Sequence, residues 1–427
     1  MTPVPSGRAD PCAPVPAVTR EDVERARLTI ADALHRTPVL SSEAFSGLAG
    51  THVELKAEHL QRTGSFKVRG ALVRLANLTP QERARGVVAA SAGNHAQGVA
   101  WAARRLGIDA EVHMPADASL PKVDATRGYG AGVVLGGLSV EDAVARAREV
   151  AEREGRTFIH PYDHPDVVAG QGTIGLEIVE QVPDVGTILV PTGGGGLLAG
   201  IAAAVPDHVR VIGVQAERAA CYPPALAAGE PVVVATERTM ADGIAVGIAG
   251  AVPLSVVRAR HVPVVTVTED SLSRAVLSLA ERAKQVVEPA GAAGAAALVQ
   301  GAASPPHQGI DALGELIDPS RPLVVVLSGG NVDPIVLRKV FRHGMSAAGR
   351  YLHLRCHLTD RPGHLARLLG VIAETGADVV TVGHVRTGSG LGVDETAVDI
   401  EVVTKGWEHS GEVLSRIREA GYDAAER

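Results

Sequence analysis

The sequence predicts an α/β fold built from doubly wound parallel sheets. From about residue 50 to residue 340, short β-branched runs bounded by Gly or Pro alternate with longer, Ala-rich amphipathic stretches. This alternation is typical of parallel strands joined by crossover helices. Hydrophobic residues make up 46% of the chain and aromatic residues only 3%, so we expect an aliphatic core. After residue 350 the pattern changes and predicts a separate, small α+β domain.

The expected elements follow from these runs in order. Strands are predicted over residues 52–56, 86–90, 109–114, 132–135, 157–160, 187–191, 210–215, 261–267 and 322–327. Helices are predicted where apolar residues recur with helical spacing, over residues 97–106, 140–154, 196–204 and 271–286. The tail predicts a strand (351–358), a helix (363–376), two strands (379–387 and 395–404) and a helix (408–421), with room for one last strand.

The length of 427 residues predicts two or three domains. Residues 1–18 lack a basic segment followed by an apolar run, so we interpret them as a disordered leader and not as a signal peptide. Residues 345–350 are predicted to be a linker. They separate a body, residues 19–344, from the tail, residues 351–427.

Composition and charge argue against several classes of protein. The net charge is −7 and no block of like charge stands out, which is unlike a protein that binds nucleic acid or an anionic membrane. The longest uncharged stretch, residues 185–206, contains Pro191 and four consecutive glycines, which would break a membrane-spanning helix. The three cysteines lie far apart, so we expect a reducing, cytoplasmic setting.

Lysine is scarce, and Lys67 has unusual surroundings. It lies between Gly64 and Gly70, next to Phe66, at the predicted start of a helix. A lysine that is partly desolvated near a helix N-terminus has a lowered pKa and is nucleophilic. An ordinary surface lysine is the alternative from spacing alone. Solvated amines are expected at Lys122, Lys284, Lys339 and Lys405.

A run of four glycines follows the strand predicted over residues 187–191 and precedes a helix of small residues. Consecutive glycines allow backbone N–H groups to converge on one oxyanion, and the helix start adds a favourable dipole, so the run suits a phosphate. A flexible turn is the alternative from this run alone. The run is neither a dinucleotide fingerprint nor a P-loop.

Two more polar turns follow predicted strands. One contains Asn94, a candidate donor to a ligand, and the other is the Ser328-Gly329-Gly330-Asn331 turn. Open α/β sheets bind ligands at the carboxyl ends of their strands. Each turn alone is compatible with simple capping, whereas four such elements on one sheet predict a ligand site.

Five motifs, GSFKVRGA, SAGNHAQG, TGGGGL, EPAGA and SGGN, occur in an order and spacing that resembles the threonine ammonia-lyases, or threonine dehydratases. These are pyridoxal-phosphate enzymes of the tryptophan synthase β-like fold. The resemblance covers about residues 19–344. It implies a large domain, about residues 19–60 and 157–344, and a small domain, about residues 61–156, each doubly wound around an open sheet. It also implies pyridoxal 5′-phosphate as cofactor and a hydroxy-amino acid as substrate.

The resemblance implies a role for each motif. Lys67 would form the internal aldimine with the cofactor, Phe66 would pack on its ring, and Ser328 would face the pyridine nitrogen. The phosphate would be held by the amides of Gly193, Gly194, Gly195, Gly196 and Leu197. The substrate carboxylate would be held by the loop Ser91, Ala92, Gly93, Asn94 and His95, with Asn94 also bonding the 3′-oxygen of the ring. Glu288 would lie near the substrate pocket. From the sequence alone, this residue could equally be an ordinary helix-capping acid.

The implied reaction is β-elimination of water, with the cofactor as electron sink. The substrate amine would displace Lys67, whose freed amine would remove the Cα proton. The hydroxyl would leave as water, protonated through the cofactor phosphate. Hydrolysis of the resulting enamine would give ammonia and 2-oxobutanoate from threonine, or pyruvate from serine.

Two departures from related enzymes bear on the reaction and on metal binding. Similar serine racemases carry a serine as a second acid/base where this chain has Ala92, and a methyl group cannot carry a proton, so elimination is favoured over racemisation. The acidic cation ligands of racemase-like enzymes fall near Gln215 and Ala220 here. No Mg²⁺ or Ca²⁺ site is therefore expected, although a monovalent site of carbonyls is compatible. The resemblance also implies that one cluster is structural and does not bind a metal, namely His160, Asp163, His164 and Asp166.

The tail resembles an ACT regulatory domain. The sequence Asp-Arg-Pro-Gly at residues 360–363 lies at its first strand-to-helix turn, where exposed amides can hold the carboxylate of an amino-acid effector. Such domains commonly pair side by side, so we expect a homodimer or a homotetramer.

The sequence therefore predicts a cytoplasmic, pyridoxal-phosphate-dependent threonine ammonia-lyase with small-molecule partners and with no nucleic acid or membrane partner. A dehydratase that prefers serine or 3-hydroxyaspartate is the main alternative, because one methylene is worth only about 1–3 kcal/mol of discrimination. A second alternative is a non-catalytic amino-acid sensor on the same fold. The intact set of motifs argues against it. A nucleotide-binding oxidoreductase is weaker still, because no dinucleotide fingerprint follows a first strand.

Overall fold

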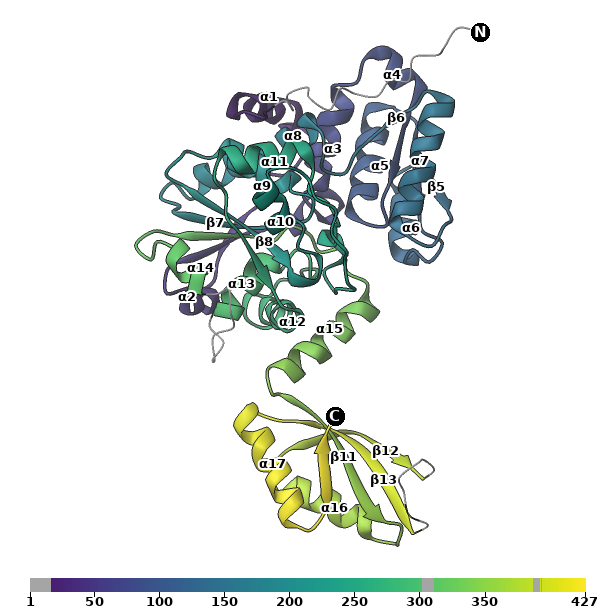
Figure 1. Cartoon of the computed structure of the whole chain (residues 1–427), viewed down its shortest axis with the longest axis vertical. Coiled ribbons are helices and arrows are strands. Elements are labelled where there is room, and N and C mark those ends of the chain that lie inside the picture. The colour runs from purple at the N-terminus through teal and green to yellow at the C-terminus, as the bar shows by residue number, and fades with distance from the viewer. Residues whose placement is uncertain (1–16, 302–310, 387–391, 393) are drawn as a thin grey trace. The chain divides into compact units, whose positions relative to one another are not determined.

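The computed structural model describes residues 17–301, 311–386, 392 and 394–427 (Figure 1). The chain divides into two compact units, Met1–Pro334 and Ile335–Arg427. Most of the predicted leader, residues 1–16, lies outside the described residues. The predicted domain boundaries at 19, 61 and 157 stay predictions.

The larger sheet of the first unit has six strands in the order β1-β2-β10-β7-β8-β9. All neighbours run parallel except β1 and β2, which pair antiparallel. The strands are β1 (Val39–Ser41), β2 (Val53–Lys56), β7 (Thr187–Pro191), β8 (Arg210–Ala216), β9 (Val264–Val267) and β10 (Leu323–Val326). Every residue of β7 and β10 is buried, which explains their continuous aliphatic sequences.

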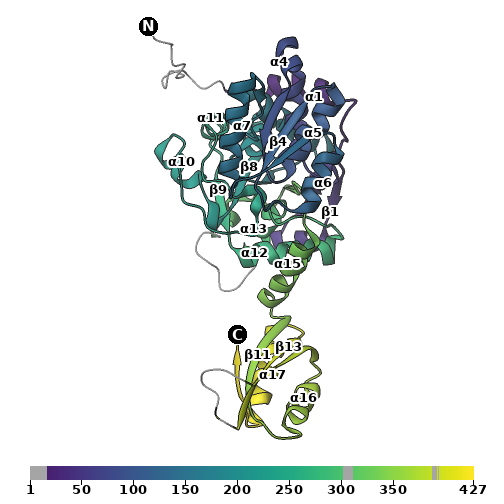
Figure 2. The ribbon, with the colours of Figure 1, turned by 90° about the vertical axis from the view of Figure 1, so that its right-hand side faces the viewer.

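The smaller sheet of this unit has four parallel strands in the order β5-β4-β3-β6. The strands are β3 (Val87–Ala90), β4 (Ala110–Met114), β5 (Gly132–Leu135) and β6 (Thr157–Phe158). The helices that pack on it are α5 (Asn94–Leu106), α6 (Leu120–Gly128) and α7 (Val140–Glu154). Figure 2 shows β4 between α7 and α5. Two open sheets, one fully parallel and one parallel except for β1, confirm the predicted α/β fold.

The first unit contains further helices and short helical turns. The helices are α1 (Arg20–Ile30), α2 (Glu43–Ala49), α3 (Lys67–Ala76), α4 (Pro80–Arg85), α8 (Pro165–Gln181), α9 (Gly196–Ala204), α10 (Tyr222–Ala228), α11 (Ala251–Ala259), α12 (Glu269–Ser278), α13 (Ala293–Gly301) and α14 (Asp311–Leu316). Short helical turns are η1 (Glu58–Leu60), η2 (Arg62–Gly64), η3 (Glu217–Ala219), η4 (Asp242–Ile244) and η5 (Leu279–Ala283).

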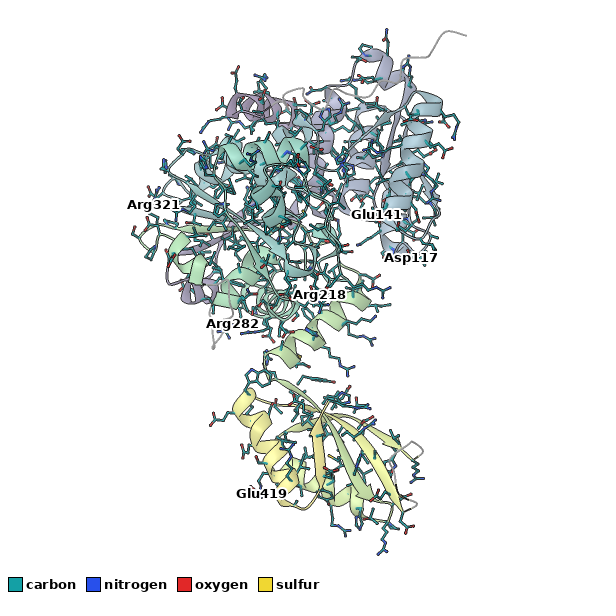
Figure 3. The ribbon with its side chains drawn as sticks, in the orientation of Figure 1. Asp117, Glu141, Arg218, Arg282, Arg321 and Glu419 are labelled. Atoms are coloured by element: carbon teal, nitrogen blue, oxygen red, sulfur yellow. The ribbon has the colours of Figure 1, made fainter. Side chains whose placement is uncertain are left out.

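Helices α8 and α9 pack closely because small residues face each other. A Cβ on Gly200 would lie 2.4 Å from the carbonyl oxygen of Val168, so a larger residue there would separate the helices. Helices α9 and α13 both pack on β7 and β8. Many charged residues lie on the surface, as the exposed Asp117, Glu141 and Arg218 illustrate (Figure 3).

The second unit is an α+β domain, as predicted. Its elements are α15 (Pro334–Ala347), β11 (Tyr351–Thr359), α16 (His364–Glu374), β12 (Asp378–Val385), β13 (Glu395–Val403), α17 (Trp407–Glu419) and β14 (Asp423–Glu426). The four strands form an antiparallel sheet in the order β12-β13-β11-β14. Leu354, Ile400 and Ile417 are fully buried in its core. The likeness of this unit to an ACT domain stays a prediction.

Two expectations about elements were wrong. The helix predicted over residues 271–286 is shorter: the α-helix ends at Ser278, and the π-helical turn η5 that follows it ends at Ala283, because Lys284 has φ +58°, which a helix does not accommodate. The predicted linker, residues 345–350, begins inside α15, which continues to Ala347. Within the part of the chain that the structure describes, no helix is long and apolar enough to cross a membrane.

Candidate active site

Lys67 is the first residue of α3, and the loop that precedes it is fixed by the turn after β10. The backbone N–H of Phe66 donates to the carbonyl oxygen of Ser328 at 3.1 Å. The Lys67 amine donates to the carbonyl oxygen of Pro161 at 3.0 Å. Burial lowers the pKa of this amine to about 8, although the charge of Glu288 opposes the shift. The amine is therefore a stronger nucleophile near neutral pH than an ordinary lysine.

Two helices in this unit begin at the carboxyl end of a parallel strand without a described side chain that caps them. Helix α5 begins at Asn94 after Gly93, and α9 begins at Gly196 after Gly195. The uncapped N–H groups and the helix dipole favour an anion at each start. A Cβ on Gly93 would meet, among the described atoms within 4 Å, only the Lys122 amine at 3.9 Å, so this start faces open space.

The glycine loop, residues 193–197, lies between two tyrosines. A Cβ on Gly194 would lie 2.4 Å from the ring of Tyr162, and one on Gly195 would lie 1.7 Å from the hydroxyl of Tyr222. Gly195 also has φ +95°, which disfavours any residue with a side chain. The Tyr222 hydroxyl donates to the carbonyl oxygen of Gly194 at 3.4 Å. The loop can therefore be built only from glycine at these positions, and its N–H groups are left for a ligand.

The half-buried Asn94 and the buried Glu288 form a polar pair beside Lys67. The Asn94 side-chain amide donates to the Glu288 carboxylate at 2.6 Å. Burial and the charge of Asp242 raise the pKa of Glu288 to about 7, against the opposing effects of Lys122, of this hydrogen bond and of Lys67. The carboxylate thus contacts a predicted site residue.

The loop after β3 places the other predicted residues next to this pair. Ser91 accepts a hydrogen bond on its side chain from the backbone N–H of Gly93 at 3.1 Å, and Ala92 lies in the same turn. His95 is buried and bonds the carbonyl oxygen of Ile159 at 3.0 Å. Burial, together with the charge of Lys67, lowers the pKa of His95 to about 3, so this ring is neutral.

The segment before α8 contacts the site, which the sequence did not indicate. Pro161 accepts from Lys67, and Tyr162 packs against the glycine loop. The neighbouring histidine side chains bond backbone amides. His160 accepts from the N–H of Asp163 at 2.8 Å, and His164 accepts from that of Asp166 at 3.1 Å. Among the described residues, no group of three or more His, Cys, Asp or Glu could hold a metal ion.

A buried ion network next to Lys67 was also missed. Arg69, two residues along α3, donates to Glu58 at 2.7 and 2.9 Å and to Glu177 at 2.6 and 3.1 Å. Lys56 donates to Glu177 at 2.5 Å. Two cations and two anions balance inside the protein and connect α3 to β2, η1 and α8. A lysine inside the aliphatic β2 sequence was the only local indication of it.

The interpretation of Lys122 as a solvated amine was wrong. Its amine lies 3.1 Å from the carboxylate of Asp242, and only 18% of its side chain is exposed. This ion pair joins α6 to η4, at a sequence separation of 120 residues. The sequence alone shows no pattern that pairs them.

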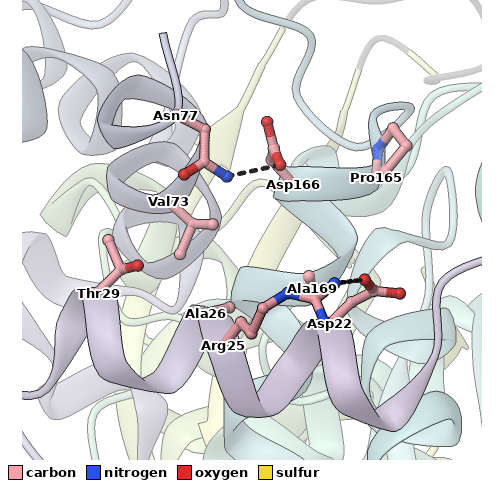
Figure 4. Close-up of a pocket in the computed structure, with 9 residues that line it drawn as sticks. All are labelled: Asp22, Arg25, Ala26, Thr29, Val73, Asn77, Pro165, Asp166 and Ala169. Atoms are coloured by element: carbon pink, nitrogen blue, oxygen red, sulfur yellow. Dashed lines mark hydrogen bonds and ion pairs between the residues drawn. The ribbon is translucent and has the colours of Figure 1, made fainter.

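A separate hollow lies on the first unit between α1, α3 and α8 (Figure 4). It measures about 200 Å³ and has none of the predicted site residues in its lining. Its polar groups bond one another, since Asp22 pairs with Arg25 and the Asn77 amide donates to Asp166 at 2.8 Å. We therefore assign no role in the reaction to this hollow.

The structure brings five of the predicted residues to one place, namely Phe66, Lys67, Asn94, Glu288 and Ser328. This set, with the glycine loop, fits a phosphorylated aldehyde: an amine for the aldehyde, an uncapped helix start for the phosphate and amide and hydroxyl groups for a polar ring. The sequence profile of the family described as pyridoxal-phosphate dependent enzyme matches residues 30–310. The chain belongs to this family of pyridoxal-phosphate-dependent enzymes.

Relatives of this pyridoxal-phosphate-dependent enzyme include two L-threonine ammonia-lyases. That of Geobacter sulfurreducens is 44% identical over 392 residues, which cover 91% of this chain and 94% of the relative. That of Thermotoga maritima is 40% identical over 409 residues, covering 95% and 98%. Among solved structures, the processed form of threonine deaminase isoform 2 from Solanum lycopersicum is 32% identical, covers 80% of this chain and 99% of its own, and superposes with a TM-score of 0.69. The predicted tryptophan synthase β-like fold is confirmed.

The lowered pKa of Lys67 predicts the pH dependence of cofactor capture. Only the neutral amine attacks an aldehyde, so the rate at which the cofactor-free enzyme captures pyridoxal phosphate should rise toward pH 8 and level off above about 8. Stopped-flow absorbance measures this rate. A rate that keeps rising toward pH 10.5, the value of an ordinary lysine, would contradict the burial argument.

Proposed function

We propose that this enzyme is an L-threonine ammonia-lyase, which converts L-threonine to 2-oxobutanoate and ammonia and L-serine to pyruvate and ammonia. The observation that carries this proposal is the Lys67 amine of lowered pKa beside the Asn94–Glu288 pair. The names of the two relatives that align with more than nine-tenths of the chain support the choice of reaction.

Each part of the site has a task in this reaction. Pyridoxal phosphate, when bound, supplies an electron sink for the negative charge that develops at the substrate Cα. Lys67 holds the aldehyde before the substrate arrives and afterwards takes the proton from Cα. The glycine loop binds the phosphate through its N–H groups. Phe66 would pack on the ring, and the Ser328 hydroxyl would face the ring nitrogen.

The start of α5 orients the substrate. Its uncapped N–H groups, in the loop of residues 91–95, bind the substrate carboxylate and turn the Cα–H bond toward the Lys67 amine. The Asn94 amide would bond the 3′-oxygen of the ring. Ala92 offers no acid or base on the face of Cα opposite Lys67, so the proton is removed and returned on one side only. This favours elimination over racemisation.

Initial rates on L-threonine, L-serine and 3-hydroxyaspartate test the proposal. We expect 2-oxo acid and ammonia in equal amounts and a kcat/KM for threonine roughly 10- to 200-fold above that for serine, the range that one methyl group supports. A higher kcat/KM for serine or 3-hydroxyaspartate would favour the alternative dehydratases. A cofactor-loaded protein that releases no ammonia from any of the three would favour an amino-acid sensor.

A further inference from the structure

A chain of hydrogen bonds, all donated in one direction or from one amide, connects Thr63, in the loop before Lys67, to Glu288. The side-chain amino group of Asn331 donates to the carbonyl oxygen of Thr63 at 2.6 Å and to the side-chain oxygen of Asn94 at 2.8 Å. The amino group of Asn94 donates in turn to Glu288 at 2.6 Å. Four groups that are distant in sequence thus share one continuous path.

The direction of this chain follows from its first acceptor. A backbone carbonyl can only accept, so Asn331 must present its amino group to Thr63. The same amino group faces Asn94, which must therefore present its oxygen. The amino group of Asn94 is left on the opposite side, where it reaches Glu288. An amide that could otherwise be turned either way is held in one orientation by its neighbour.

The surroundings of Asn331 require a donor and leave its side chain little room. Besides Thr63 and Asn94, a third oxygen, that of the Gln97 side chain, lies 3.5 Å from the Asn331 amino group. On its other side the loop of Lys67 comes close, since a Cβ on Gly64 would lie 2.3 Å from the Asn331 side-chain oxygen. An aspartate at this position would place an oxygen against three oxygens.

We propose that Asn331 is a positioning residue, which orients the Asn94 amide so that its second N–H faces the 3′-oxygen of pyridoxal phosphate. The amino group of Asn94 has two hydrogens, of which one is bonded to Glu288 and the other is available to the ring oxygen. Asn331 acts through Asn94 and does not itself contact the cofactor. This inference rests on the proposed function, in which Asn94 bonds that oxygen.

Cofactor binding to the apoenzyme of Asn331→Asp tests the proposal. We expect roughly tenfold weaker binding of pyridoxal phosphate, the effect of one net hydrogen bond, and unchanged binding of the 3-deoxy analogue, which lacks the oxygen that Asn94 would meet. Titration followed by absorbance gives both dissociation constants. An equal loss for the two cofactors, or no loss for either, would overturn the proposal, because a merely structural role does not depend on one oxygen of the ligand.

A matched control and a second variant complete the experiment. Asn77→Asp makes the same substitution at an exposed amide that also donates to an oxygen, that of Asp166 at 2.8 Å, and it should bind both cofactors as the wild type does. If Asn331→Asp does not fold by circular dichroism, Asn331→Ala is compared in the same way. Its loss should again be confined to pyridoxal phosphate.

A double-mutant cycle separates this inference from the proposed function. When Asn94→Ala is already present, Asn331→Asp should weaken cofactor binding no further, since it has no amide to orient. Additive losses would contradict the proposed path. A wild-type protein that binds no pyridoxal phosphate, or that makes no 2-oxo acid, would refute the proposed function. If the wild type binds the cofactor and makes 2-oxo acid, and Asn331→Asp binds the cofactor equally well, only the role of Asn331 is refuted.

Discussion

Replacing Lys67 by alanine is expected to lower 2-oxobutanoate formation by at least about four orders of magnitude, since one amine both holds the cofactor and moves the Cα proton. A methyl group in place of the whole aminobutyl side chain leaves the backbone at the start of α3 intact and removes the amine that donates to Pro161. Turnover of threonine and the visible absorbance of the bound cofactor should both be lost in the purified variant.

The matched control for this variant is Lys339→Ala. Lys339 is exposed on α15, so this change also removes one lysine and should keep both turnover and absorbance. A Lys67→Ala variant that keeps the absorbance of the wild type would show that the cofactor is attached elsewhere.

Replacing Arg69 by methionine is expected to lower the free energy of unfolding by about 3–5 kcal/mol. Arg69 and Glu58 are fully buried, and the variant leaves Glu58 in the interior without its cation. Burial opposes ionisation of Glu58, yet Arg69 outweighs it and holds the pKa of this carboxyl below its ordinary value. The midpoint of urea denaturation, followed by circular dichroism, measures the loss.

A charge-balanced variant shows whether the unpaired carboxylate is the cause. Removing both partners, as Glu58→Leu with Arg69→Met, keeps the Lys56–Glu177 pair and should be less destabilising than Arg69→Met alone. The surface control Arg127→Met, in α6, should change the free energy of unfolding by less than about 0.5 kcal/mol. A double variant as unstable as the sum of its single variants would contradict the ion-pair argument.

The fold could be predicted in large part because its strands are local patterns. Short aliphatic runs between glycines and prolines mark buried parallel strands, and β5 and β7 have the predicted bounds. Strand β1 was missed, because three half-buried residues, Val39–Ser41, are too few to show a pattern. The helix over residues 271–286 was overextended, because amphipathic spacing does not reveal that Lys284 turns into the left-handed region.

The candidate site, like the fold, could be predicted only where its features are local in the sequence. Lys67 and the glycine loop could be proposed from neighbouring residues, since a lysine between glycines and a run of glycines are local features. The Asn94–Glu288 bond joins residues 194 positions apart, and the Asn331–Asn94 bond joins residues 237 apart. Such pairs come together only through the folding of the two sheets, so no spacing in the sequence predicts them. The resemblance to the ammonia-lyases indicated Glu288, but not its partner.

The central claim is that the Lys67 amine forms the covalent link to the cofactor, and the most direct measurement is the location of that link. Borohydride reduces the carbon–nitrogen double bond between amine and aldehyde to a stable single bond, and mass spectrometry of the digested protein identifies the modified residue. The account predicts one phosphopyridoxyl group, carried by the peptide that contains Lys67. A group on Lys56, Lys122 or another lysine, or an unmodified protein after loading with the cofactor, would contradict it.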